Sequence, residues 1–267
     1  MTTDAGADAG RPPAMPVVRT ISFDDVKTAL SAGVKDFLAA PMFGLFFGAF
    51  YALGGLLLVM FIARLDMHYM IYPLAIGFPL VGPFIAVGLY EVSRGIQRGE
   101  VLTWKSVLAK VWEQKGRELS IMAFVTLFIM WIWMYQVRLL VAIFLGQKSF
   151  STLSGFLQNV LHTTEGLEFL VVGHVVGAAL YTVLFTVTVV SIPLLLDREV
   201  DFVTAIITSV KAVLKNPVVM LGWALVVLAL SVLAMIPAFL GLLIVLPVLG
   251  HATWHLYQRL VEPAATP

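Results

Sequence analysis

The feature that most constrains this chain is a unit that occurs three times: a charged amphipathic stretch of about five turns, followed by bilayer-length apolar segments. A hydrocarbon core of about 30 Å requires roughly 20 apolar residues of helix. By this length we place six spans. The first four lie at residues 41–62, 70–90, 119–137 or in a longer form 119–145, and 170–196, and the last two lie within 217–257. The last run divides near Pro237, because proline removes a backbone donor and disfavours helix at the preceding residue. The sequence therefore predicts an all-α polytopic membrane bundle of three parallel units, about 20–92, 101–196 and 199–260.

Composition excludes several classes of protein. The chain is 60% hydrophobic and only 12% charged, so its solvent is mostly lipid. Its 17 Lys and Arg balance 16 Asp and Glu, which excludes the basic surface that nucleic-acid binding needs. It has no cysteine, which excludes disulfides, thiolate metal sites and thiol nucleophiles. We expect no bound cofactor and no metal.

The positions of the cations predict the orientation of the spans. All but three of the 17 Lys and Arg fall on one predicted face, the exceptions being Arg64, Arg138 and Lys148. Short basic loops stay cytoplasmic, so both termini are expected in the cytoplasm. Residues 1–19 are rich in Ala, Gly, Asp, Thr and Pro and are expected to form a disordered cytoplasmic tail before a single membrane domain at 20–262.

The first and last units share residue identities at the same spacing. Thr28-Ala29, Val34-Lys35, Leu38 and Pro41 correspond to Thr204-Ala205, Val210-Lys211, Leu214 and Pro217. In both copies apolar residues step by three or four, which predicts an amphipathic helix, and Ser22 with Asp25 is a suitable cap for the first. A middle stretch from Trp104 to Trp112 repeats the stripe without the proline. The apolar stripes face either acyl chains at the cytoplasmic interface or the helix bundle itself.

Small residues and prolines mark places where the spans pack or break. Gly44, Gly48 and Ala52 form one small-residue face and Gly173 with Gly177 another, and we favour packing within the chain over packing against another chain. The second span contains Pro73, Pro79 and Pro83, so it should be kinked. Such a break either lines a site or only curves the bundle, and we favour the second because no acidic residue accompanies it.

Arg138 is the cation closest to a span interior. It follows Trp131, Trp133 and Tyr135, which suit the outer membrane interface. If the third helix continues to Leu145, Arg138 lies deeper and needs a partner. Residues 139–165 then form an outer-face excursion with an apolar stripe, which is either interfacial or re-entrant.

Three of the five histidines are candidate functional residues. His174 could ligate haem or hydrogen-bond a neighbouring helix, and the second is favoured for a lone intramembrane histidine. His251 and His255 lie one helical turn apart and could clamp a metal. Their neighbours Trp254, Tyr257 and Arg259 instead favour a headgroup anchor at the end of the last span.

Four short stretches carry a resemblance to a known family. They are Tyr72-Pro73-Leu74; Pro79-Leu80-Val81-Gly82-Pro83 with Gly88-Leu89-Tyr90-Glu91; Pro193-Leu194-Leu195-Leu196-Asp197-Arg198; and Pro247-Val248-Leu249-Gly250-His251-Ala252-Thr253-Trp254-His255. Over residues 20–262 the chain resembles the bacterial integral membrane proteins of domain-of-unknown-function family 2189.

The resemblance implies a multi-pass protein of the inner membrane of a Gram-negative bacterium. Members are sometimes labelled cytochrome c oxidase subunits, and no functional residue is established for the family. A haem–copper subunit needs six His ligands and a dinuclear copper subunit needs two Cys, whereas this chain has five His and no Cys. An accessory or assembly role is the most that this label can mean here.

These observations predict a non-catalytic protein. The sequence has no Gly-rich phosphate loop, His-Glu-x-x-His or Gly-x-Ser-x-Gly motif, so no enzymatic activity is expected. We expect an accessory, assembly or scaffold partner of another membrane complex, such as a respiratory one, with the lipid bilayer and a membrane protein as its partners. The alternative is a small-solute or lipid-handling transporter that uses the broken second span.

Overall fold

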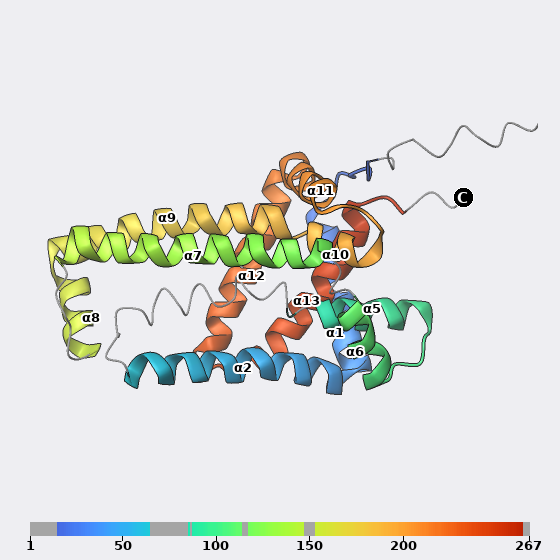
Figure 1. The fold of residues 1–267 in the computed structure, drawn as a ribbon, viewed down its shortest axis with the longest axis horizontal. Coiled ribbons are helices and arrows are strands. Elements are labelled where there is room, and N and C mark those ends of the chain that lie inside the picture. The colour runs from blue at the N-terminus through green and yellow to red at the C-terminus, as the bar shows by residue number, and fades with distance from the viewer. Residues whose placement is uncertain (1–14, 65–84, 86, 114–116, 147–152, 264–267) are drawn as a thin grey trace, which may run out of the picture.

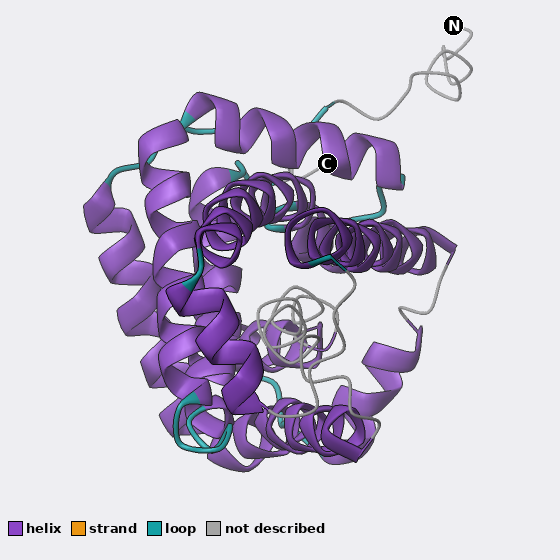
Figure 2. Cartoon of the chain, turned by 90° about the vertical axis from the view of Figure 1, so that its left-hand side faces the viewer, coloured by secondary structure: helices purple, strands orange, loops and turns teal. Residues whose placement is uncertain are grey.

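The chain folds into helices throughout its described part (Figures 1 and 2). The computed structural model describes residues 15–64, 85, 87–113, 117–146 and 153–263. The helices are α1 (Phe23–Ala39), α2 (Pro41–Arg64), α5 (Val87–Arg98), α6 (Trp104–Glu113), α7 (Arg117–Leu145), α8 (Leu153–His162), α9 (Thr164–Thr188), α10 (Ser191–Asp197), α11 (Phe202–Lys215), α12 (Pro217–Met235) and α13 (Leu242–Leu260). This confirms the all-α fold class.

Three helical segments within the described residues are long and apolar enough to cross a membrane. They are α7, the continuous stretch formed by α9 and α10, and α12. A fourth candidate arises if α1 and α2, which are bent by 103° at Ala40, count as one broken span. The predicted second span falls largely on residues 65–84 and 86, outside the described residues. The count of six spans therefore stays a prediction.

Several predicted boundaries can be compared with the helices. The third span takes its longer form, since α7 continues to Leu145, and the fourth begins earlier than predicted, at Thr164. Within residues 139–165, the structure describes the end of α7, the helix α8 and the start of α9, while residues 147–152 lie outside the described residues. The last run divides near Pro237 as predicted, with Ala238 and Phe239 at positive φ in the turn between α12 and α13.

The helices form two long edges joined by a crossing pair (Figure 1). Helices α7 and α9 lie side by side along the long axis, and α2 runs along the opposite edge. Helices α12 and α13 cross between these edges, and α8 lies at the far end of the α7–α9 pair. The large core joins α1, α2, α5, α6, α10, α11, α12 and α13 with one end each of α7 and α9. The remainder of α7 and α9 shares a smaller cluster with α8, around Trp133, Phe156 and Phe169.

The amphipathic helices begin at the caps that their sequences provide. Ser22 caps α1, and its reciprocal hydrogen bonds with Asp25 confirm the predicted pair. Thr103 caps α6 in the same way with Ser106. Asp201 caps α11 by accepting a hydrogen bond from the Thr204 amide at 2.9 Å.

Candidate functional site

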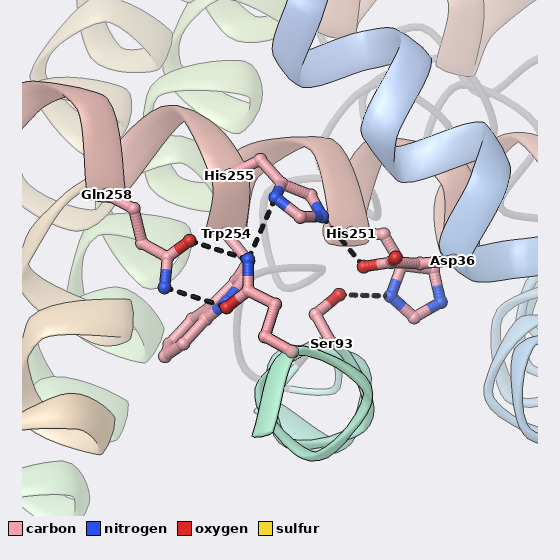
Figure 3. Close-up of polar contacts among 7 residues, drawn as sticks. Asp36, Ser93, His251, Trp254, His255 and Gln258 are labelled. Atoms are coloured by element: carbon pink, nitrogen blue, oxygen red, sulfur yellow. Dashed lines mark hydrogen bonds and ion pairs between the residues drawn. The ribbon is translucent and has the colours of Figure 1, made fainter. Parts of the chain in front are cut away.

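A polar cluster lies where α1, α5 and α13 meet (Figure 3), with Asp36, Ser93 and His251 buried and Gln97 and Gln258 exposed. Glycine makes this meeting possible, because a Cβ atom on Gly33 of α1 would lie 2.6 Å from the backbone nitrogen of Ala252 on α13. This close approach brings Asp36, one turn further along α1, to His255 of α13. Helix α5 contributes Ser93 and Gln97 from the third side.

Both ring nitrogens of His255 have partners. Its Nε2 lies 2.7 Å from Asp36 Oδ2, and its Nδ1 lies 3.1 Å from Gln97 Nε2. The Trp254 indole nitrogen, which can only donate, lies 3.0 Å from Gln97 Oε1 and so fixes the orientation of the Gln97 amide. Gln97 Nε2 therefore donates to His255 Nδ1, which leaves the imidazole proton on Nε2, directed at Asp36.

Gln97 also joins α5 to the last turn of α13 through Gln258. Gln97 Nε2 donates to Gln258 Oε1 at 2.7 Å, and Gln258 Nε2 donates to Gln97 Oε1 at 2.8 Å. His251, one turn earlier on α13, is fully buried, and its Nδ1 lies 2.7 Å from Ser93 Oγ. Each polar side chain of the cluster thus contacts another helix, and the network fastens α13 to α1 and α5.

The structure places His251 and His255 in separate hydrogen-bonded contacts. The two imidazoles have separate partners rather than one shared centre, and the described part of the chain holds no group of three or more His, Asp or Glu side chains placed for a metal ion. His251 is enclosed by protein, so it is not a headgroup anchor. The two histidines instead form hydrogen bonds between helices.

His174 is hydrogen-bonded within its own helix. Its Nδ1 lies 2.7 Å from the carbonyl oxygen of Leu170, one turn earlier on α9. The cavity beside it, between α7 and α9, measures about 20 Å³ and is lined by Trp133, Phe169 and Gly173. This space suits about one water molecule and is far too small for haem.

Arg138 occupies an exposed position on α7. The helix continues seven residues beyond it, to Leu145, which is the deeper of the two placements considered above. Its side chain forms no ion pair with another described residue, and the preceding turn presents Trp131 and Tyr135, whose ring centroids lie 4.7 Å apart. The broken-helix positions Pro73, Pro79 and Pro83 lie outside the described residues.

A second polar feature is a pocket of about 620 Å³ between α5, α6, α7, α10 and α11. Its charged lining consists of four cations and four carboxylates: Arg94, Arg98, Lys110, Arg198, Glu118, Asp197, Glu199 and Asp201. Its apolar wall is formed by Leu119, Leu195, Leu196 and Val200. Sequence reasoning did not find this pocket, because its residues come from four separate stretches of the chain.

Long apolar helices, with most of the buried polar groups satisfied by partners inside the fold, define an integral membrane protein. The comparisons agree with this class. Residues 71–197 match the model of the family described as predicted integral membrane protein (DUF2189). The Gly-His-Ala-Thr-Trp-His stretch lies outside the matched residues. No curated protein and no solved structure matches the chain.

Proposed function

We propose that this protein is a non-catalytic, six-span protein of the bacterial inner membrane that acts as an accessory, assembly or scaffold partner of another membrane complex. The observation that carries the proposal is an aromatic row on the outward face of α7. Phe124, Phe128, Trp131 and Tyr135 recur at steps of four and three, so they share one face of the helix. Each has between 47% and 68% of its surface exposed.

The members of the row hold one another in place. Successive ring centroids lie 6.1, 6.1 and 4.7 Å apart from Phe124 to Tyr135. Rings that are already ordered lose little conformational freedom on binding, and aromatic residues are enriched in protein interfaces. In lipid, helices associate by close packing rather than by the hydrophobic effect, so a rigid ridged face suits a partner helix.

The amphipathic helices support the arrangement in three units. Ala40 and Asn216, which join α1 to α2 and α11 to α12, have nearly the same backbone angles, with φ, ψ of −136°, 56° and −128°, 51°. Helices α1, α6 and α11 each leave a large apolar residue exposed, namely Leu38, Trp112 and Leu214. These exposed faces favour helices that lie in the membrane interface with their apolar side toward acyl chains.

The polar cluster supports a non-catalytic role for its histidines. A general base or metal ligand must direct a ring nitrogen at substrate or metal. Here His255 uses both ring nitrogens to join three helices, and His251 is buried against Ser93. The hydrogen bonds of these two histidines therefore favour a structural role, in which they hold helices together.

The test compares the aromatic row with an exposed face of another helix. We purify three proteins from membranes in mild detergent: wild type, F128A/W131A and V171A/V175A. The last is the control, because Val171 and Val175 on α9 are exposed to a similar extent as Phe128 and Trp131. We expect one membrane protein to copurify at fixed stoichiometry with wild type and V171A/V175A but not with F128A/W131A. A homogeneous wild-type particle that moves solute across liposomes would instead support the transporter alternative and overturn the proposal.

A further inference from the structure

The pocket between α5, α6, α7, α10 and the start of α11 contains cations whose hydrogen-bond donors are only partly matched by acceptors. Three of its four carboxylates already accept hydrogen bonds from other groups of the protein. Glu118 accepts a hydrogen bond from the Phe202 amide at 2.8 Å, Asp197 accepts one from the Tyr257 hydroxyl at 2.7 Å, and Asp201 caps α11. The Thr204 hydroxyl and amide lower the pKa of Asp201, so its carboxylate stays ionised and committed to that cap.

The cations are less fully matched. Arg98 reaches Glu100 only at 3.9 Å, and Lys110 pairs with Glu113 at the surface, where such a pair contributes little. Arg198 directs one nitrogen at the carbonyl of Glu262, but its buried Nε donates no hydrogen bond to the described chain and lies 3.7 Å from Asp197 Oδ2. Three cations thus retain donor capacity on one pocket, which suits an anion with several oxygen acceptors.

The position of the pocket indicates where that anion comes from. Helix α6 contributes Lys110 to the pocket and α11 begins directly after the lining residue Asp201, and these two helices expose Trp112, Val203 and Ile207. A helix that presents apolar side chains beside a charged pocket lies at the boundary between acyl chains and headgroups. The volume of about 620 Å³ is in the range of small-molecule sites and exceeds what a single phosphate requires.

We propose that this pocket binds the phosphate group of a membrane glycerophospholipid through Arg98, Lys110 and Arg198, with the glycerol and first acyl carbons against Leu119 and Leu196. Phosphate supplies the acceptor oxygens that these cations lack. The proposal is independent of the accessory role, because it concerns the cytoplasmic end of the bundle and not the outer face of α7.

The experiment uses the full-length, delipidated protein in detergent, with binding measured by native mass spectrometry. The probes are dioleoylphosphatidylglycerol, dioleoylglycerol with the same tails and no phosphate, and inorganic phosphate. We expect the phospholipid to bind and dioleoylglycerol not to bind. R98Q/K110Q should weaken phospholipid binding by about tenfold or more, since each basic residue near a membrane surface contributes about 1 kcal/mol.

The control variant K27Q/K211Q removes the same charge from exposed positions on α1 and α11, and it should bind the phospholipid like wild type. Arg98 and Lys110 make only surface ion pairs, so R98Q/K110Q should unfold at the wild-type temperature. If both variants lost phospholipid binding equally, net charge alone would explain the loss, and the proposed binding site would be wrong. If inorganic phosphate displaced the phospholipid at equal concentration, the pocket would be a site for free phosphate and the proposed lipid ligand would be wrong.

Discussion

Asp36 illustrates how one polar residue organises this fold at the residue scale. Its side chain is 9% exposed, in a protein whose interior is mostly apolar, and such a group is stable only when it is paired. His255 provides that pairing at 2.7 Å. Asp36 is buried on the face of α1 that it shares with Ala29 and Gly33, and this face packs against α13.

Replacing Asp36 with alanine should lower the free energy of unfolding by about 1–3 kcal/mol, because the buried Nε2–H of His255 loses its acceptor. Thermal or denaturant unfolding of the detergent-purified protein measures this loss. Asp24→Ala is the matched control, since Asp24 lies on the same helix, is 87% exposed and pairs only with Lys27. Similar losses in the two variants would contradict the role assigned to Asp36.

At the scale of the element, the decisive contact is that between α1 and α13. The two helices form the most extensive helix pair in the described chain, and the buried face of α1 consists of Ala29, Gly33 and Asp36. Gly48 gives α2 a similar approach, since a Cβ there would lie 2.6 Å from the carbonyl oxygen of Leu243. Small residues on α1 and α2 therefore pack within the chain, as the sequence favoured.

Replacing glycine with alanine should have different effects on stability at Gly33 and at Gly173. Gly33→Ala places a methyl group 2.6 Å from the α13 backbone, which cannot move aside, and should destabilise the protein by about 1–3 kcal/mol. Gly173→Ala meets nothing nearer than 4.0 Å and should be neutral or stabilise by up to about 1 kcal/mol, because alanine restricts the unfolded chain. Unfolding midpoints of both variants test this, and equal destabilisation would argue against the close α1–α13 contact.

At the scale of the whole molecule, the two ends of the chain are joined. The Arg19 amide donates to the Leu260 carbonyl at 2.7 Å, and the Glu262 amide donates to the Val17 carbonyl at 3.0 Å. Val17 to Arg19 belong to the stretch predicted as a tail, so the ordered chain begins before residue 20. Asn216 adds a third connection, because its side chain accepts from the Ile21 amide and donates to the Arg19 carbonyl.

Because the ends pair directly, both must lie on the same side of the membrane. Reporter fusions at the amino end and after Pro263 should therefore both report the cytoplasm, where the cations place them. A fusion at His162, the end of α8, should report the opposite side. Fusions that place the two ends on different sides would contradict the pairing and the proposed orientation together.

Asn216→Ala should loosen the amino-terminal segment while the helices stay folded. It removes the acceptor of the Ile21 amide and the donor to the Arg19 carbonyl, so hydrogen exchange at Ile21 should accelerate by at least about tenfold. Lys211→Gln, an exposed change on the same helix, is the control and should leave the exchange unchanged. Unchanged protection at Ile21 in Asn216→Ala would show that the terminal pairing does not depend on Asn216.

The predictability of the candidate site differs from residue to residue. His251 and His255 stood out because they are rare polar residues one turn apart, but their partners did not. Ser93 and Gln97 lie 158 residues before them in the chain, and no local pattern connects the two stretches. The signal that could have indicated Asp36 is its place after Ala29 and Gly33, which mark a face small enough for another helix to approach.

The sequence by itself determined the all-helical class, the membrane as solvent, the capped start of α1, and the break near Pro237. These features depend on local chemistry: side-chain period, capping groups and the geometry of proline. Only the tertiary structure decided which polar groups pair, which glycines meet a backbone, and which cations share a pocket. Those contacts join segments far apart in the chain, so they arise from how whole helices pack, which no short stretch of sequence specifies.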